Sequence, residues 1–301
     1  MKSVNVTEVL EIKIMNQLTR KQIRHFQKTI YEYYERYGRE DLPWRRTRDP
    51  YRILVSEMML QQTQVSRVIE KYEPFIRQFP DFESLARSPL RVVLKAWSGL
   101  GYNRRALLLR KTAQIVVSEF DGHLPSQVDV LVGLPGIGKA TAAGIAAFAF
   151  DKAYPLVETN IRTVFIYFFF NRSKKVNDAD IVQSEEQTKV NDADVLALVK
   201  QTLDVKDPRM WYHALMDYGA MLKKKYPRLS LKSDRYVSQG RFEGSNRQAR
   251  GLIVKALTSR SLNELDLHRA TGLSLTRIRS NTEKLVREGM LVKKRTRFSI
   301  A

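Results

Sequence analysis

Glu57 is a carboxylic acid inside an otherwise apolar stretch, ILVSEMML (residues 53–60). Apolar surroundings disfavour the charged form of a carboxyl group, so burial should raise the pKa of Glu57 and keep it protonated. A buried glutamate is costly unless it is paired or has a function. Glu57 is therefore a candidate proton donor.

The charge of the chain favours a polyanionic partner. Its 301 residues include 52 Lys and Arg against 32 Asp and Glu, a net charge of +20. This excess favours nucleic acid over the alternative of a merely basic protein. The absence of cysteine excludes disulfides, thiolate zinc sites, cysteine nucleophiles and cysteine-held iron–sulfur clusters. No apolar run is long enough to span a membrane, so we expect a soluble, cytoplasmic protein without a membrane partner.

The segment LPGIGK (residues 134–139) has the residue types of a phosphate-binding turn. Gly136 and Gly138 let the backbone turn tightly and approach a ligand. The helix expected after them presents free N–H groups, and Lys139 adds a positive charge. An ordinary helix–helix turn is the alternative. Because the segment follows a helix and the chain is basic, we prefer a helix-hairpin-helix that grips a DNA phosphate.

The elements that position these residues are helical. Apolar residues recur at three- and four-residue spacing, and short Gly, Pro and Asp punctuation separates the runs. The runs are residues 23–34, 53–79, 90–96, 106–120, 128–133 and 140–150. The pattern predicts an all-α fold with short connections.

The composition divides the chain into a helical domain (residues 1–222), a basic linker (223–249) and a C-terminal module (250–301). In the module, helical patterns over residues 251–257, 262–270 and 274–288 precede a basic, strand-like tail. This order resembles a winged helix-turn-helix, with Arg277, Arg279 and Lys284 on or near the second helix of the turn. DNA contact and a packing or dimerisation role are both open.

Seven short segments together resemble the MutY-type adenine DNA glycosylases of the helix-hairpin-helix DNA glycosylase superfamily. In order, they are LPWR (42–45), PY (50–51), SEMMLQQTQV (56–65), WSGLGY (97–102), LPGIGK (134–139), VETNIR (157–162) and ALMDYGAM (214–221). The resemblance implies a two-lobed helical fold. It also implies that the protein excises adenine mispaired with 8-oxoguanine or guanine from double-stranded DNA, by flipping the base out of the helix.

The resemblance assigns the chemistry to two carboxyl groups and an amide. Glu57 would protonate the departing adenine at a ring nitrogen and activate water. Glu158 stands where the family usually has Asp and would lie near the sugar, one methylene longer than the family residue. We prefer this role to helix capping, because Asp or Ser would cap better. Asn160 matches the family's supporting hydrogen-bonding residue.

Four further residues match family positions that handle the DNA. Gln62 corresponds to the wedge beside the orphaned base, and Tyr102 to the intercalating aromatic residue. Trp44 and Arg45 match residues around the flipped-base pocket, although Trp44 is equally compatible with a core position.

Three departures from the family refine this prediction. Lyase-type relatives have a Schiff-base Lys where this chain has Ala140, and Lys139 would point about 100° away from it on a helix, so we expect a monofunctional glycosylase. The stretch LKKKYPR (222–228) lies where the family has its four-cysteine iron–sulfur loop, and we expect its lysines to supply positive charge for phosphates. We also expect no catalytic metal, although the carbonyl groups of the hairpin could hold a monovalent cation. The protein is expected to be a monomer. The family's β-rich C-terminal domain is not visible.

Two rival functions remain open at this stage. The same scaffold could remove thymine or uracil from mismatches with guanine. The segment QQT (61–63) favours adenine, whereas Ala140 and the missing C-terminal domain do not. The other rival is a DNA-binding protein with a retired active site, against which Glu57, Glu158 and Asn160 argue.

Overall fold

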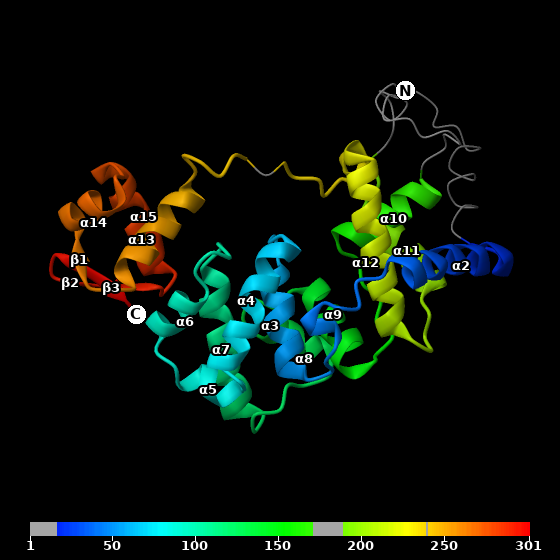
Figure 1. Ribbon diagram of the computed structural model, residues 1–301, viewed down its shortest axis with the longest axis horizontal. Coiled ribbons are helices and arrows are strands. Elements are labelled where there is room, and N and C mark those ends of the chain that lie inside the picture. Colours follow the sequence, from blue (N-terminus) through cyan, green and yellow to red (C-terminus); the bar gives the residue numbers. More distant parts are fainter. Residues whose placement is uncertain (1–16, 171–188, 239) are drawn as a thin grey trace, which may run out of the picture. The chain divides into compact units, whose positions relative to one another are not determined.

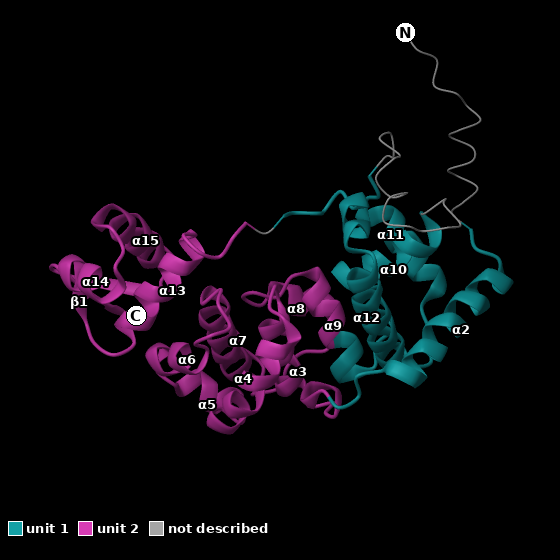
Figure 2. Ribbon diagram, turned by 45° about the horizontal axis from the view of Figure 1, so that its top comes forward, with its two compact units in different colours: residues 1–41, 146–238 teal, residues 42–145, 239–301 magenta. Residues whose placement is uncertain are grey.

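The computed structural model describes residues 17–170, 189–238 and 240–301, and it confirms the predicted helical fold class (Figure 1). The described residues form helices joined by short connections, with one small three-stranded sheet near the C-terminus. They divide into two compact units, residues 1–41 with 146–238 and residues 42–145 with 239–301 (Figure 2). No helix in the described part of the chain has the length and apolar character needed to cross a bilayer.

The first unit is built around packed aromatic side chains. Phe26 of α2 makes edge contacts with Phe165, Phe168 and Phe169 of α10 and with Trp211 of α12. The helices of this unit are α2 (Arg20–Tyr37), α10 (Thr159–Phe169), α11 (Asp192–Thr202), α12 (Pro208–Lys225) and the 3-10 helix η2 (Pro227–Lys232). The unit boundary falls inside α9 (Lys139–Phe150), whose last turns belong here.

The second unit contains a lobe of short helices. These are η1 (Pro43–Arg45), α3 (Pro50–Leu60), α4 (Val65–Gln78), α5 (Phe82–Arg87), α6 (Leu90–Ala96), α7 (Arg104–Glu119), α8 (Val128–Gly133) and the first turns of α9. Local sequence explains where they begin. Asp49 caps α3 through the backbone N–H of Arg52, and Pro50 follows at the first helical position.

The periodic run predicted over residues 53–79 is not one helix. The structure breaks it into α3 and α4, because Gln62 adopts a left-handed backbone conformation with φ of 54° and ends the helical path. Apolar spacing continues across the break, so periodicity did not reveal it.

The C-terminal module, also in the second unit, has three helices and a sheet. Its elements are α13 (Asn246–Leu257), β1 (Leu262–Asn263), α14 (Glu264–Thr271), α15 (Leu275–Arg287), β2 (Leu291–Lys294) and β3 (Arg297–Ile300). The antiparallel sheet has the order β1-β3-β2, with Leu262 opposite Phe298 and Leu291 opposite Ile300. Residues 262–263 therefore form a strand where the periodicity predicted the start of a helix.

The segment predicted as a basic linker contains regular structure at both ends. Helix α12 continues to Lys225, η2 follows it with Leu229 fully buried, and Ser245 caps α13. A parallel bridge also pairs Val190 with Ser233. Composition indicated a linker because the buried contacts are few and widely spaced. The predicted boundaries at residues 222 and 249 stay a prediction.

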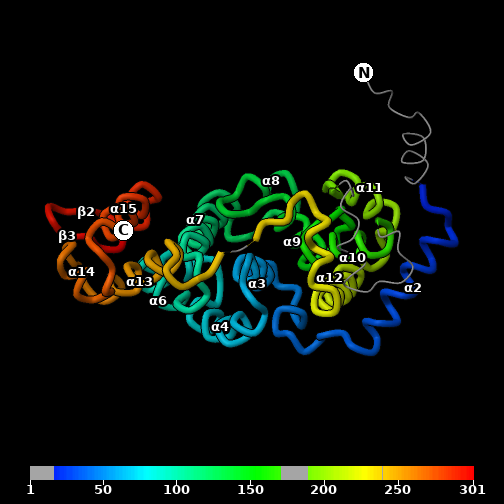
Figure 3. The backbone as a smooth tube through the Cα atoms, turned by 90° about the horizontal axis from the view of Figure 1, so that it is seen from above, coloured from blue at the N-terminus to red at the C-terminus, as the bar shows by residue number. Residues whose placement is uncertain are grey.

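A glycine allows α10 and α12 to approach each other closely (Figure 3). A Cβ atom on Gly219 of α12 would lie 2.3 Å from the carbonyl oxygen of Asn160 and 2.8 Å from its Cβ. Real side chains essentially never make such contacts, and the carbonyl group of Asn160 belongs to backbone that cannot swing away. The beginning of α10, which carries Asn160, therefore depends on the missing side chain at position 219.

We expect Gly219→Ala to lower the free energy of unfolding by about 1–3 kcal/mol, because overpacking forces the two backbones apart. The matched control is Gly251→Ala in α13, where an added Cβ meets nothing within 4 Å. That change should raise stability by up to about 1 kcal/mol through helix propensity. Urea unfolding of both variants tests the difference, and equal effects would contradict the close-packing account.

Candidate active site

Glu57 lies in the last turn of α3 at the border between core and solvent. It is half-buried, and its neighbours Ser56 and Met58 are buried. Its helix is held against the core by Ile53, Leu54 and Val55, which are almost completely shielded from solvent. The carboxyl group is thus carried on a rigid element, as a proton donor must be. Its predicted role in protonation stays a prediction.

A buried guanidinium, that of Arg105 in α7, holds the end of α3. Its Nη1 donates to the carbonyl oxygens of Met58, Met59 and Gln61 at 2.6–2.9 Å. A positive charge at the carboxyl end of a helix also complements the helix dipole. Burial lowers the pKa of Arg105 to about 10, which still leaves the group charged at neutral pH.

The same guanidinium holds the turn that precedes α7. Its Nη2 donates to the carbonyl oxygens of Leu100 and Gly101 and to the hydroxyl of Thr63 at 2.9–3.2 Å. The guanidinium carbon also lies 5.4 Å from the ring centroids of Trp97 and Tyr102. Arg105 therefore ties the 61–63 turn and the 97–102 turn to one another.

These two turns carry Gln62 and Tyr102, the residues predicted to enter the DNA. Both have left-handed backbones, with φ of 54° for Gln62 and 46° for Tyr102. For residues other than glycine this conformation costs roughly 1–2 kcal/mol, and such strain clusters at functional sites. Gln62 is exposed and Tyr102 half-buried. The strain is consistent with the predicted insertion roles without testing them.

The LPGIGK hairpin joins α8 to α9 and packs against the same end of α3. Gly136 has φ of 83°, and a Cβ there would lie 2.8 Å from the Met58 methyl group. Gly138 and Lys139 are exposed at the start of α9, where they can reach a ligand. The side-chain amide of Gln61 donates to the carbonyl oxygen of Gly136 at 3.2 Å. The hairpin and the Gln62 turn are therefore directly connected.

Glu158 is the N-cap of α10, so the prediction that this residue would not cap a helix was wrong. Its predicted place near the sugar stays a prediction. Its Oε1 accepts from the backbone N–H groups of Asn160 and Ile161, both at 2.8 Å. Glutamate can cap here because its extra methylene lets the carboxylate fold back over the first turn. Average capping preferences rank Asp and Ser above Glu, and they do not take account of this geometry.

The environment of Glu158 adjusts its charge state in opposing directions. The net effect is a raised pKa, because burial of the carboxyl outweighs the two backbone N–H bonds and the charges of Lys223 and Arg162, which act to lower it. The side-chain amide of Asn160 approaches Oε2 at 3.3 Å. Asn160 and Glu158 therefore form one polar cluster, and the supporting role that the family position implies for Asn160 stays a prediction.

Trp44 and Arg45, the two residues expected around a flipped base, differ in how deeply they are buried. Trp44 is 6% exposed and packs edge-on against Tyr72, so the core interpretation of Trp44 describes its position. Arg45 is half-buried in the same 3-10 helix, η1. The contacts predicted between these two residues and the flipped base stay predictions.

Sequence reasoning missed Arg105 and Gln61. A signal for Arg105 exists, because it falls at helical spacing with Leu109, Thr112 and Val116, all of which are buried. That spacing places a charged residue on the inner face of α7. For Gln61 no signal separates it from its neighbour Gln62.

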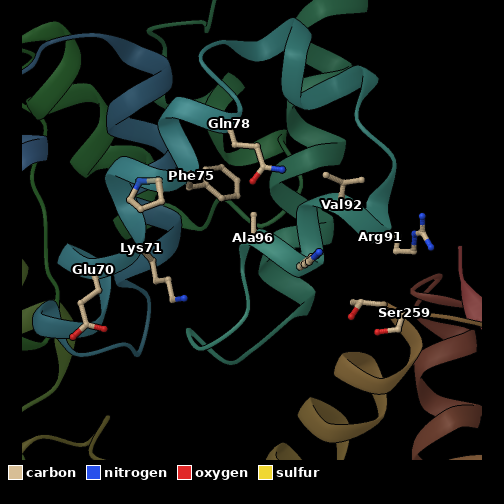
Figure 4. Close-up of a pocket in the computed structure, with 11 residues that line it drawn as sticks. Glu70, Lys71, Phe75, Gln78, Arg91, Val92, Ala96 and Ser259 are labelled. Atoms are coloured by element: carbon tan, nitrogen blue, oxygen red, sulfur yellow. The ribbon is translucent and has the colours of Figure 1, made fainter.

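A hollow of about 720 Å³ lies between α4, α6 and the end of α13 (Figure 4). Lys71, Arg91 and Lys95 give it a basic lining, with Glu70 as its carboxylate. None of the predicted catalytic or DNA-binding residues lines this hollow. It is therefore separate from the candidate site.

Comparison with solved structures defines the class of protein. The structure is similar to that of a thermostable thymine-DNA glycosylase, with a TM-score of 0.58, 28% identity and coverage of 68% of this chain and 89% of that one. An endonuclease III–DNA complex matches with a TM-score of 0.50 and 18% identity, over 66% of this chain and 85% of that one, which shows the shared fold. The fold is that of the helix-hairpin-helix DNA glycosylases.

Sequence comparison identifies the family within this class. The family described as "HhH-GPD superfamily base excision DNA repair protein" matches residues 55–191. The adenine DNA glycosylase of Mycobacterium tuberculosis (strain H37Rv) is 33% identical over 246 residues, which are 78% of this chain and 79% of the relative. That of Buchnera aphidicola subsp. Baizongia pistaciae is 43% identical over 151 residues. The chain belongs to the adenine DNA glycosylase family of the HhH-GPD superfamily.

The matched regions differ in extent between relatives. The similarity to the Buchnera protein covers 50% of this chain and 43% of the relative. For the adenine DNA glycosylase of Mycolicibacterium smegmatis, 46% identical, the figures are 42% and 44%. The chain thus spans less than half the length of several curated relatives that it matches.

We expect Arg105→Met to lower the free energy of unfolding by about 3–5 kcal/mol, because it leaves several carbonyl acceptors of the two turns without their donor, at about 1–3 kcal/mol for each that stays unpaired. Arg105→Lys should lose less, since it keeps the charge and some of the donors. The control is Arg104→Met, an exposed neighbour in α7, with an expected change within about 0.5 kcal/mol. Urea unfolding that gave equal losses for Arg104→Met and Arg105→Met would refute the role of Arg105.

Strain at Gln62 predicts different effects on stability for two substitutions at this exposed position. Gln62→Gly should leave the free energy of unfolding nearly unchanged, because relief of the left-handed strain offsets the added chain entropy. Gln62→Val should lower it by about 1–2 kcal/mol, because a β-branched residue tolerates φ of 54° poorly. Thermal unfolding measures both, and a Val variant as stable as the Gly variant would show that the turn is not strained.

Proposed function

We propose that the protein is a monofunctional DNA glycosylase that excises adenine mispaired with 8-oxoguanine or guanine from double-stranded DNA. The observation that carries the proposal is the similarity to a protein named adenine DNA glycosylase across 78% of this chain and 79% of the relative. The two strained turns beside Glu57 and the hairpin support it, because base flipping requires side chains that fill the gap.

In the proposed reaction Glu57 is the general acid. Hydrolysis of the bond between adenine and the sugar requires a proton on the departing base, which leaves poorly as an anion. Glu57 gives its proton to a ring nitrogen of adenine, and its carboxylate then takes a proton from the attacking water. One carboxyl group thereby serves both steps, and proton balance is kept.

Glu158 and Asn160 are proposed to stabilise the positive charge that develops on the sugar. Oε1 of Glu158 is occupied by the two backbone N–H groups of the cap, whereas Oε2 accepts the weaker bond from the Asn160 amide. We therefore assign the charge-stabilising contact to Oε2. A carboxylate held by a helix N-terminus does not need to reorganise when the charge appears.

The DNA-binding residues of the proposal are Gly136, Gly138 and Lys139 at the hairpin, with Gln62 and Tyr102 entering the duplex and Trp44 and Arg45 at the flipped base. The exposed lysines 223–225 at the end of α12 add positive charge for phosphates. The proposal includes a mismatched duplex as partner, a monomeric enzyme and a cytoplasmic location.

Ala140 in the lyase position supports base removal without strand cleavage.

The proposal uses no cofactor. The chain has no cysteine, and the stretch after residue 222 forms the end of α12 and the packed helix η2, so it offers no thiolate ligand for a cluster. Among the described residues, no three His, Asp or Glu side chains are grouped to hold a metal ion. A monovalent cation at the hairpin stays a prediction, and no step is assigned to it.

A second candidate function is removal of thymine or uracil opposite guanine. It is favoured by the similarity to a thermostable thymine-DNA glycosylase, which covers 89% of that chain at 28% identity. The third possibility from the sequence, a DNA-binding protein with a retired active site, is an outcome of the experiment below.

We expect Glu57→Gln to reduce adenine release from an adenine:8-oxoguanine duplex by about 10²–10⁴-fold, the usual contribution of a general acid. Affinity for the same duplex should persist, since the amide is nearly the same shape. Single-turnover base release and fluorescence anisotropy measure the two quantities. The matched control is Glu119→Gln, an exposed carboxylate at the end of α7, which should act like wild type. Near-normal release by the Glu57 variant would contradict the assignment, and absence of release by wild type on every mismatch would favour the DNA-binding protein.

A further inference from the structure

Arg247, in the first turn of α13, contacts the turn that carries Tyr102. Its Nη1 donates to the Tyr102 hydroxyl at 2.9 Å, and its guanidinium carbon lies 5.7 Å from the centroid of the tyrosine ring. Nη2 donates to the carbonyl oxygen of Gly240 at 2.6 Å. A residue of the C-terminal module thus covers the side chain proposed to enter the DNA.

The position of Arg247 is fixed by the module. Nη2 of Arg277 in α15 donates to the carbonyl oxygens of Gly244 and Ser245, at 2.9 and 3.0 Å. The Ser245 hydroxyl accepts from the backbone N–H of Gln248 and so caps α13. A movement of Arg247 that follows its backbone would therefore carry the module with it.

The charge of Arg247 is not neutralised by these contacts. Both of its hydrogen-bond acceptors, a hydroxyl and a carbonyl, are neutral groups, and a guanidinium has five N–H donors. Arg250, one turn further along α13, instead forms a two-bond ion pair with Glu288. Of these two arginines, Arg247 is the one suited to an additional anion.

Insertion of Tyr102 changes what Arg247 can contact. A ring stacked between bases offers its faces to the bases, so a cation near the ring loses part of its attraction. The acceptors then nearest to the guanidinium are the phosphate oxygens that flank the insertion point. Guanidinium groups bind phosphate in a bidentate manner and more strongly than a neutral hydroxyl.

We propose that Arg247 is a DNA-phosphate ligand that exchanges the Tyr102 hydroxyl for the backbone beside the inserted ring, and so places the C-terminal module on the DNA. The inference rests on the proposed function through the insertion of Tyr102. It assigns the module a DNA contact that does not involve Arg277, Arg279 or Lys284, the residues that its helix-turn-helix pattern indicated.

The test is binding of the full-length protein to a duplex that carries a stable abasic-site analogue, measured between roughly 50 and 200 mM salt. Arg247→Ala should weaken binding about 3- to 10-fold and reduce the salt slope by about 1, the signature of one lost phosphate contact. The loss should be equal with 8-oxoguanine, guanine or adenine opposite the analogue. Arg247→Lys should keep the salt slope and lose less affinity, because the charge remains.

The control is Arg269→Ala, which removes the same charge from an exposed position in α14 that does not contact Tyr102. If Arg247→Ala and Arg269→Ala have equal affinities and slopes, the proposal is overturned. It is also overturned if Arg247→Ala binds more tightly, which would make the contact inhibitory, or if its loss depends on the opposite base, which would make Arg247 a base reader. Because binding is measured without base release, these outcomes stand even if the proposed glycosylase activity fails.

Discussion

The buried guanidinium of Arg105 is the interaction on which the geometry of the site depends. It donates hydrogen bonds to three carbonyl groups at the end of α3, to the Thr63 hydroxyl and to two carbonyl groups of the 97–102 turn. Two left-handed residues, Gln62 and Tyr102, stand beside these acceptors. Strain of this kind persists where the surroundings over-determine the conformation, and Arg105 provides that constraint. Its burial is tolerated because its two Nη atoms find several acceptors.

The polar cluster at the start of α10 rests on a different constraint, that of close backbone approach. Gly219 lets the beginning of α10 lie directly against α12, because it has no side chain. Glu158 accepts hydrogen bonds from the first N–H groups of α10. A carboxylate with a structural task can also stabilise a transient charge, because one oxygen is held while the other faces a weaker donor. The same contacts that orient the group oppose the effect of burial on its pKa.

The sequence predicted the helical class, the hairpin and the family because each depends on local pattern or on short segments in order. Helices over residues 90–96 and 128–133 begin and end as predicted, at α6 and α8. Long-range interactions were not predictable in this way. The network of Arg105 joins residues more than 40 positions apart, and Gln62 and Tyr102 belong to residue types that do not signal a left-handed backbone. For Glu158, average capping preference pointed away from the cap that the chain forms.

Base release from four duplexes tests the proposed adenine glycosylase activity: adenine opposite 8-oxoguanine, adenine opposite guanine, thymine opposite guanine and uracil opposite guanine. Strand breakage is scored before and after alkali, because a monofunctional enzyme leaves an intact strand with an abasic site. We expect alkali-dependent breakage at adenine in the first two duplexes. Release of thymine or uracil, with adenine left in place, would rule out an adenine glycosylase and assign the protein to the mismatch-thymine branch of the superfamily.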